Sequence, residues 1–311
     1  MVQPVSMGAV AATKASETTP GQSSGAAAYA MDWRGSAPVS AKRLVGTGET
    51  PPHPANDSDL VARAKLDALL SADVYKDDPN PPAGFHVASD GELADLNLTP
   101  AMLERPGVSS FRARVYVEGS GDGARYVVAF RGSESGEDWK NNFEQGVGMD
   151  APSYAKALRI GREIARSGAD VTFTGHSLGG GLASAASIAS GREADTFNAA
   201  GLSQNTIGEA RAIASANGRG SAAVQAYHVP GEVLTMVQNG GDRAAGAILG
   251  GIFGGLPGGI AGAIGADAPP AFGTRHTLPD VRPHGKSFVD GLNPVDRHKI
   301  DWVLAGTAAL R

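Results

Sequence analysis

The sequence predicts an α/β fold with a mainly parallel central sheet and helices on both faces. After residue 125, short apolar and β-branched runs alternate with helical patterns, as in sheets whose parallel strands are joined by helices. Apolar residues make up 41% of the 311-residue chain, which suffices for a core in one large domain or two small ones. The net charge of −5 argues against a nucleic-acid partner, and the lack of cysteine excludes disulfides, thiolate metal sites and thiol nucleophiles.

Composition divides the chain into an arm and a folded domain. Residues 1–57 are rich in Ala, Ser, Thr, Pro and Gly without sustained periodicity, and they predict a disordered N-terminal arm. Residues 58–311 form the predicted domain, with a Gly-rich insertion at about 240–272. The N-terminus also lacks the charged and apolar regions of a secretory signal.

Turn and cap residues separate the predicted elements of this domain. Ser58 suits the N-cap of a first helix, and the Gly-rich run at 119–123 suits a turn between two strands. A later helix places Tyr154 and Ile164 on one face and ends at Gly168. The predicted elements are a helix over about 59–76, strands at 111–118 and 125–130, a helix over about 153–167, a strand at 171–174, a helix at 181–190, a strand at 194–198, a helix over about 203–216, a strand at 224–229 and a final helix from 293.

Residues 170–181 carry the most informative motif of the chain. A strand leads into Gly-His-Ser-Leu-Gly at 175–179, and a helix of small residues follows. In this context G-x-S-x-G forms a nucleophile elbow, in which Ser177 occupies a sharp turn between strand and helix. The bare pattern also fits an ordinary turn in a Gly-rich protein, but the flanking strand and helix favour the elbow of an α/β-hydrolase fold of the lipase-like kind.

A serine nucleophile needs an imidazole base, which in this fold follows the serine and the acid along the chain. Three of the seven histidines do not follow the serine, and these are His53, His86 and His176. The remaining candidates are His228, His276, His284 and His298. His298 is favoured because Asn293-Pro294 begins the final helix and places His298 in its first turns, whereas His276 is expected in a turn and His284 in a Pro/Gly loop.

The acid that orients the imidazole is predicted at Glu232. This residue follows the strand at 224–229 and a Pro-Gly turn, so it lies at the carboxyl end of a strand, although an exposed turn residue fits the same pattern. Asp195 begins its strand and therefore lies at the opposite edge of the sheet. Asp242 in the Gly-rich insertion and Asp280 are weaker alternatives.

A series of motifs over about residues 58–310 resembles the fungal-type, class 3-like lipase superfamily, and more closely the lipase-domain effectors that bacteria deliver into rival cells by contact-dependent secretion. The motifs are Phe130-Arg131-Gly132-Ser133, Asp138-Trp139, Asn142, Gly175–Gly179, Thr196-Phe197-Asn198, Gly231-Glu232-Val233-Leu234 and Asn293–His298. The resemblance implies a catalytic set of Ser177, Glu232 and His298, with Glu232 where fungal lipases usually have Asp. It also implies an oxyanion hole formed by Ser133 and the backbone N–H of Leu178.

The function that this resemblance implies is hydrolysis of carboxylic esters in membrane glycerophospholipids by acyl transfer, without cofactor or metal. A phospholipid membrane surface, a cognate immunity protein and a secretion-system component are the implied partners, with synthesis in a bacterial cytoplasm and export by a specialised secretion system. A triacylglycerol lipase or carboxylesterase is the alternative. A non-catalytic membrane- or partner-binding protein on the same scaffold is the third hypothesis, against which the complete candidate triad argues.

The segment 244–266 is unusual because it contains no charged residue and repeats Gly every four positions from 246 to 262. Such spacing places small residues on one helical face, as in packed membrane helices. Pro257 and the many glycines make the segment a poor helix in water. We expect either a Gly-rich loop over the active site or a lid that docks on lipid, in preference to a transmembrane anchor.

Overall fold

The computed structural model describes residues 57–104, 110–133, 151–238 and 269–311. The chain divides into two units, Met1–Thr47 and Gly48–Arg311, and the described residues all belong to the second. Of the arm predicted over 1–57, only the last position is therefore described. The segment 244–266 and most of the insertion at 240–272 also lie outside the described residues. The Asp138-Trp139 and Asn142 motifs also lie outside them.

A seven-stranded sheet forms the centre of the described domain, and its strands lie in sequence order. The first three strands are antiparallel, and from the third to the seventh every neighbouring pair is parallel. The mainly parallel sheet is therefore confirmed. The strands are β1 Phe85–Val87, β2 Ala113–Glu118, β3 Arg125–Phe130, β4 Asp170–His176, β5 Ala194–Phe197, β6 Val224–His228 and β7 Thr274–Thr277.

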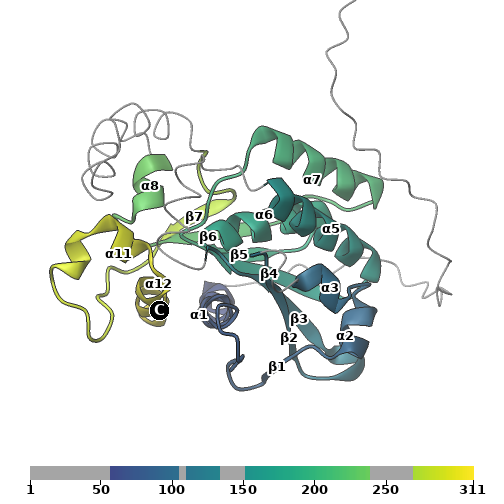
Figure 1. The fold of residues 1–311 in the computed structure, drawn as a ribbon, viewed down its shortest axis with the longest axis horizontal. Coiled ribbons are helices and arrows are strands. Elements are labelled where there is room, and N and C mark those ends of the chain that lie inside the picture. Colours follow the sequence, from purple (N-terminus) through teal and green to yellow (C-terminus); the bar gives the residue numbers. More distant parts are fainter. Residues whose placement is uncertain (1–56, 105–109, 134–150, 239–268) are drawn as a thin grey trace, which may run out of the picture. The chain divides into compact units, whose positions relative to one another are not determined.

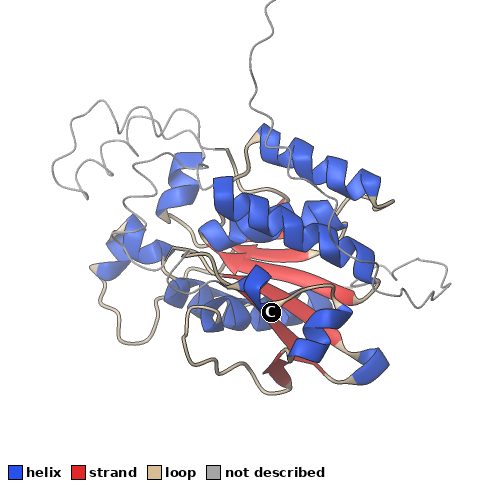
Figure 2. Ribbon diagram, turned by 45° about the vertical axis from the view of Figure 1, so that its right-hand side comes forward, coloured by secondary structure: helices blue, strands red, loops and turns tan. Residues whose placement is uncertain are grey.

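Helices cover both faces of this sheet (Figures 1 and 2). Three of them, α5 Ala151–Ser167, α6 Leu178–Ser190 and α7 Gln204–Ala216, connect successive strands from β3 to β6. Because each crossover steps to the next strand in the same direction and crossovers are right-handed, all three helices lie on one face. The other face is covered by the first and last helices, α1 Asp57–Asp73 and α12 Ile300–Ala308, which pack against each other.

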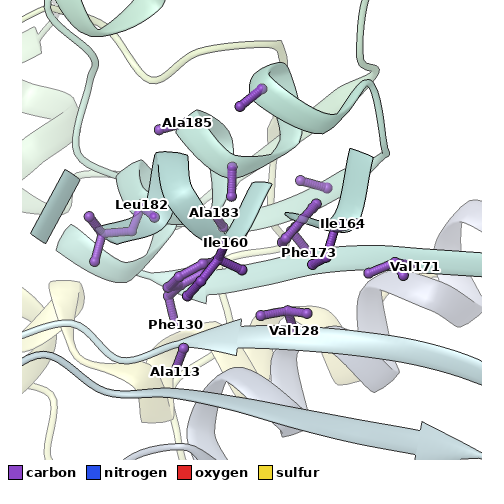
Figure 3. Packing of buried hydrophobic residues seen from close by; sticks show 14 of the residues in the cluster. Ala113, Val128, Phe130, Ile160, Ile164, Val171, Phe173, Leu182, Ala183 and Ala185 are labelled. Carbon is purple, nitrogen blue, oxygen red and sulfur yellow. The ribbon is translucent and has the colours of Figure 1, made fainter. Parts of the chain in front are cut away.

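The main core lies between the sheet and α5, α6 and α7. Phe130 of β3 and Phe173 of β4 stack with ring centroids 6.2 Å apart, and both are fully buried. Ile160 and Ile164 of α5 and Leu182 of α6 belong to the same cluster, with Ile160 near Phe130 and Ile164 near Phe173 (Figure 3). Each such side chain contributes about 1.5–3 kcal/mol on burial. Because this core fixes β3, β4 and the start of α6, it also fixes the turn that carries the predicted nucleophile.

On the opposite face, an ion pair ties α1 to the sheet. Arg63 of α1 donates two hydrogen bonds of 2.9 Å to Asp195 of β5, and a third to Glu193. Burial and the charge of Asp195 raise the pKa of Asp67, which lies on the next turn of α1. Asp195 is thus paired with Arg63 of α1, whereas His298 bonds to Glu232.

The structure differs from the sequence predictions in one helix cap, one break in a helix and several short elements. Ser58 lies inside α1 instead of capping it, and His276 lies in β7 instead of a turn. The final helix is interrupted, because α11 Pro294–His298 ends before α12 begins and Lys299 between them is extended (ψ 151°). The elements that the sequence analysis missed are β1, α2 Asp90–Asp95, α3 Pro100–Leu103, β7, the 3-10 turn η2 Asp290–Leu292 and, as a helix, α8 Val233–Gln238.

Candidate active site

The nucleophile candidate Ser177 occupies the turn between β4 and α6. Its backbone has φ 60° and ψ −128°, a conformation that non-glycine residues rarely adopt, and its side chain is 4% exposed. The peptide carbonyl of Ser177 accepts hydrogen bonds from the N–H groups of Gly180, Gly181 and Ala200. The packing around the turn therefore holds the strained conformation, as a nucleophile elbow requires.

The glycines on either side of Ser177 are required by close backbone contacts. A Cβ on Gly175 would lie 2.3 Å from the carbonyl oxygen of Gly179, and a Cβ on Gly179 would lie 2.2 Å from that of Phe130. No side chain fits at these distances without moving the backbone. Hence both glycines of the motif serve to bring the end of β3 and the start of α6 against the turn.

Glu232 lies directly before α8, after the turn that follows β6. Its side chain is fully buried, and its two carboxylate oxygens accept the backbone N–H groups of Leu234 and Thr235. Burial by itself raises the pKa of Glu232, but the hydrogen bond and charge of His298 and the N–H of Thr235 outweigh it, so the pKa lies below its ordinary value. Glu232 is therefore an ionised carboxylate fixed at the start of α8.

His298 lies between Ser177 and Glu232 and contacts both. Its Nδ1 is 2.6 Å from Oε2 of Glu232, and its Nε2 is 2.9 Å from Oγ of Ser177. A carboxylate only accepts hydrogen bonds, so Nδ1 carries the proton and Nε2 accepts the hydroxyl proton of Ser177. The structure thus brings together the three side chains that the sequence analysis singled out, although the serine and the histidine are 121 positions apart.

The carbonyl of His298 explains why the final helix is interrupted. This oxygen accepts hydrogen bonds from Nε2 of His176 at 2.7 Å and from Nδ2 of Asn198 at 3.1 Å. Asn198 follows β5 with φ 44°, and its Oδ1 accepts the N–H of Val229 at 2.9 Å. The carbonyl of His298 is directed at these side chains, and the chain turns to an extended conformation at Lys299.

His176, the variable residue of the G-x-S-x-G motif, belongs to a second chain of hydrogen bonds, which leads from the carbonyl of His298 to Tyr75 and Gly132. Its Nδ1 is 3.1 Å from the hydroxyl of Tyr75, and that hydroxyl accepts the N–H of Gly132 at 3.0 Å. Burial, followed by the nearby charge of His298, lowers the pKa of His176 to about 3. His176 is consequently a neutral imidazole at neutral pH.

Of the two oxyanion-hole candidates, Leu178 directly follows the nucleophile, and Ser133 follows Gly132, which packs against it. Ser133 follows Gly132 at the end of β3, where a Cβ on Gly132 would lie 3.2 Å from Cβ of Ser177. Leu178 is the first residue of α6, and N–H groups in the first turn of a helix have no acceptor within the helix. The residue before Ser133 and the first residue of α6 therefore adjoin Ser177.

The alternative histidines and acids lie elsewhere. His228 ends β6 and bonds to Thr277, and His276 in β7 bonds to Gln225. Asp280 forms an ion pair with Arg297 at 2.5 Å, and Asp242 lies outside the described residues. His284 lies in a turn between β7 and α11, as expected. None of the described alternatives takes the place of His298 or Glu232.

Sequence reasoning missed Tyr75, Asn198 and the hydrogen bonds of His176. Asn198 stands in a motif that was noted without a role, and its positive φ after a strand is a preference that Asn shares with few residues. Tyr75 carries no local signal, because its partners His176 and Gly132 are 101 and 57 positions away. A place in the last turn of the helix predicted over about 59–76 gives no reason to expect such contacts.

Comparison with known proteins places this site in a family. A family model described as a Tle-like phospholipase domain matches residues 66–284, which is well over half of the chain. The chain belongs to the Tle-like phospholipase family. Ser177 and Glu232 lie within the matched residues, and His298 follows them.

A curated relative of this chain is the extracellular phospholipase A1 of Serratia liquefaciens. The two are 41% identical over 141 residues, which cover 45% of this chain and 43% of the relative. The chain thus matches less than half the length of that relative. Within the described part of the chain, no helix has the length and apolar character to cross a bilayer, and no group of three or more His, Asp or Glu side chains is arranged to hold a metal ion.

Proposed function

We propose that this Tle-like phospholipase hydrolyses carboxylic esters of membrane glycerophospholipids through Ser177, His298 and Glu232. The observation that carries the proposal is the continuous hydrogen-bonded chain from Oγ of Ser177 through the imidazole of His298 to the carboxylate of Glu232. The strained elbow and the burial of all three side chains support it, because catalytic constellations need preorganised groups. The order along the chain is the order that α/β-hydrolases use.

In the proposed reaction, His298 takes the proton of Ser177 as Oγ attacks the ester carbonyl. Nε2 is the acceptor for this proton, since Nδ1–H is held by Glu232. The carboxylate stabilises the imidazolium that forms, and this requires Glu232 to be ionised, in agreement with its lowered pKa. His298 then protonates the leaving alkoxide, and water hydrolyses the acyl-enzyme with His298 again acting as base.

We assign the oxyanion hole to Ser133 and the backbone N–H of Leu178. Leu178 directly follows Ser177, and the residue before Ser133 packs against it; a developing negative charge is stabilised by donors already in place. Loss of one such donor costs about 3–4 kcal/mol of transition-state stabilisation in a serine protease. We expect Ser133→Ala to lower kcat on the order of 10²–10³-fold while leaving the fold intact.

The biological setting that we propose is an exported enzyme of the fungal-type lipase superfamily that acts on the membranes of rival bacteria. The motif series supports this, as does the extracellular location stated for the relative from Serratia liquefaciens. A cognate immunity protein and a secretion-system component are the proposed partners. The name phospholipase A1 of that relative further suggests the sn-1 ester as the site of cleavage.

The test of the proposed function is fatty-acid release from phosphatidylethanolamine vesicles and from a soluble short-chain ester. The purified chain should hydrolyse the vesicle lipid, and Ser177→Ala should lose this activity by several orders of magnitude. His298→Ala should be nearly as damaging, whereas His284→Ala in the exposed turn should be mild. Hydrolysis of the soluble ester alone would contradict the phospholipid assignment, and full activity of Ser177→Ala would contradict the mechanism.

A further inference from the structure

We propose that Tyr75 and His176 are positioning residues of this enzyme, which fix the backbone of His298 relative to the end of β3. The inference rests on the proposed function, because it concerns the geometry of the same Ser177–His298 pair. Four groups form one chain of hydrogen bonds: the N–H of Gly132, the hydroxyl of Tyr75, the imidazole of His176 and the carbonyl of His298. Neither Tyr75 nor His176 contacts the reacting atoms in the proposed mechanism.

The direction of every bond in this chain follows from its two ends. The carbonyl of His298 can only accept, so Nε2 of His176 carries the proton at 2.7 Å. Nδ1 of the neutral ring is then an acceptor, so the hydroxyl of Tyr75 donates to it at 3.1 Å. The oxygen of Tyr75 is left to accept the N–H of Gly132 at 3.0 Å. Each polar group has one role, and a protonated His176 would break the chain.

The His298 end of the chain controls the reacting geometry. The carbonyl that His176 holds belongs to the same residue as the imidazole that contacts Ser177 at 2.9 Å. Asn198 holds the same carbonyl from the end of β5. The two donors take the place of a next-turn helical N–H, and α11 ends at this residue. Because a small misplacement of a catalytic group costs much of its effect, these two bonds bear directly on turnover.

The Gly132 end of the chain reaches the proposed oxyanion hole. A Cβ on Gly132 would lie 2.4 Å from the hydroxyl of Tyr75 and 2.7 Å from the carbonyl oxygen of His176, so the backbone there packs directly on the chain. The next residue is Ser133, whose hydroxyl we assign to the oxyanion. Tyr75 and His176 therefore couple the position of the base to the position of the oxyanion donor.

Substitutions of His176 separate hydrogen bonding from shape. The side-chain nitrogen of glutamine can occupy the place of Nε2, whereas asparagine is too short to reach His298 and phenylalanine keeps only the ring. We expect His176→Gln to retain kcat within a few-fold, and His176→Asn and His176→Phe to lose about 10–100-fold in kcat with little change in KM. If only His176→Gln retains kcat, the hydrogen bond to His298 accounts for the role of His176, and the packing of its ring does not.

A matched pair of tyrosine substitutions tests the other end. Tyr75→Phe removes the hydroxyl between Gly132 and His176, and we expect kcat to fall about tenfold. Tyr116→Phe is the control, since Tyr116 packs in the same cluster as Tyr75 but its buried hydroxyl donates to Asp73 at 2.9 Å and to none of the four groups of this chain. The control should lose stability and keep kcat. In a His176→Phe background, Tyr75→Phe should add less than it does alone.

A spectroscopic readout tests the chain independently of turnover. In ¹⁵N NMR of the full chain at pH 7, His176 should be the neutral Nε2–H tautomer, and Tyr75→Phe should shift its Nδ1 resonance. If the wild type hydrolyses no ester but shows this tautomer, the proposed function fails while the hydrogen-bonded chain stands. A protonated or Nδ1–H His176 would overturn the inference, and so would equal kcat values for His176→Gln and His176→Phe in an active enzyme.

Discussion

The buried imidazole of His176 predicts a specific dependence of stability on pH. Its pKa is lowered by burial and then by the charge of His298, from an ordinary 6.5 to about 3. The unfolded chain therefore takes up a proton at this residue below pH 6.5, whereas the folded chain does not until pH 3. The stability that His176 contributes is complete above pH 6.5 and is lost as the pH falls from 6.5 towards 3.

The magnitude follows from the two pKa values. At pH 5, which is about 1.5 units below the pKa of 6.5, protonation of His176 stabilises the unfolded state by about 2 kcal/mol. At pH 8 the same protonation contributes almost nothing. His176→Gln removes the titration and keeps a donor towards His298. The difference in unfolding free energy between pH 8 and pH 5 should consequently be about 2 kcal/mol smaller in His176→Gln than in the wild type.

The assay is urea unfolding of the full chain at pH 8, 6.5 and 5, followed by circular dichroism. The groups that face His176 are Tyr75, His298 and Glu232, and all three stay in place in the variant. His86→Gln, which removes a half-exposed imidazole on β1, is the control. Equal pH dependence of the wild type and His176→Gln would refute the reasoning.

Three further substitutions test the packing and charges around the site. Gly179→Ala forces a methyl group to within 2.2 Å of the last carbonyl of β3 and should lower the unfolding free energy by about 3 kcal/mol. The control Gly208→Ala, on the open surface of α7, should raise the unfolding free energy slightly. Equal urea midpoints of the two variants would contradict the contact at Gly179. Glu232→Gln should lower kcat on the order of 10³–10⁴-fold with the fold unchanged, as measured by ester hydrolysis, and a mild effect would argue against Glu232 as the orienting acid. Arg63→Ala leaves the buried carboxylate of Asp195 without its cation and should cost about 3–5 kcal/mol in thermal or urea unfolding; the added substitution Asp195→Asn should restore part of the loss, and no restoration would contradict the ion pair.

The sequence was informative where structure depends on neighbours along the chain. The elbow around Ser177 combines an apolar strand, two glycines and a small-residue helix, and local sterics suffice to predict it. Glu232 was predictable as the carboxylate after a strand, because the carboxyl ends of parallel strands share one edge of the sheet. His298 was reached by elimination and by the resemblance, and the structure places its ring between the other two.

The sequence was uninformative where tertiary contacts decide the local structure. Pro294 and the apolar residues after it indicate one final helix, but hydrogen bonds from His176 and Asn198 to the carbonyl of His298 divide it. β7, which contains His276, was missed because its four residues, Thr-Arg-His-Thr, include no apolar side chain that would indicate a buried strand. The role of Tyr75 could not be predicted from the sequence, because its hydrogen-bond partners are far away along the chain.

The most direct measurement of the central claim is the rate of fatty-acid release from phosphatidylethanolamine vesicles by the wild type, Ser177→Ala, His298→Ala and the double variant. Residues that act as one catalytic unit are strongly non-additive, so either single substitution should abolish nearly all activity and the double variant should be no worse than Ser177→Ala. Additive losses, or a Ser177→Ala enzyme that still releases fatty acid at the wild-type rate, would contradict the assignment of Ser177 and His298 as nucleophile and base.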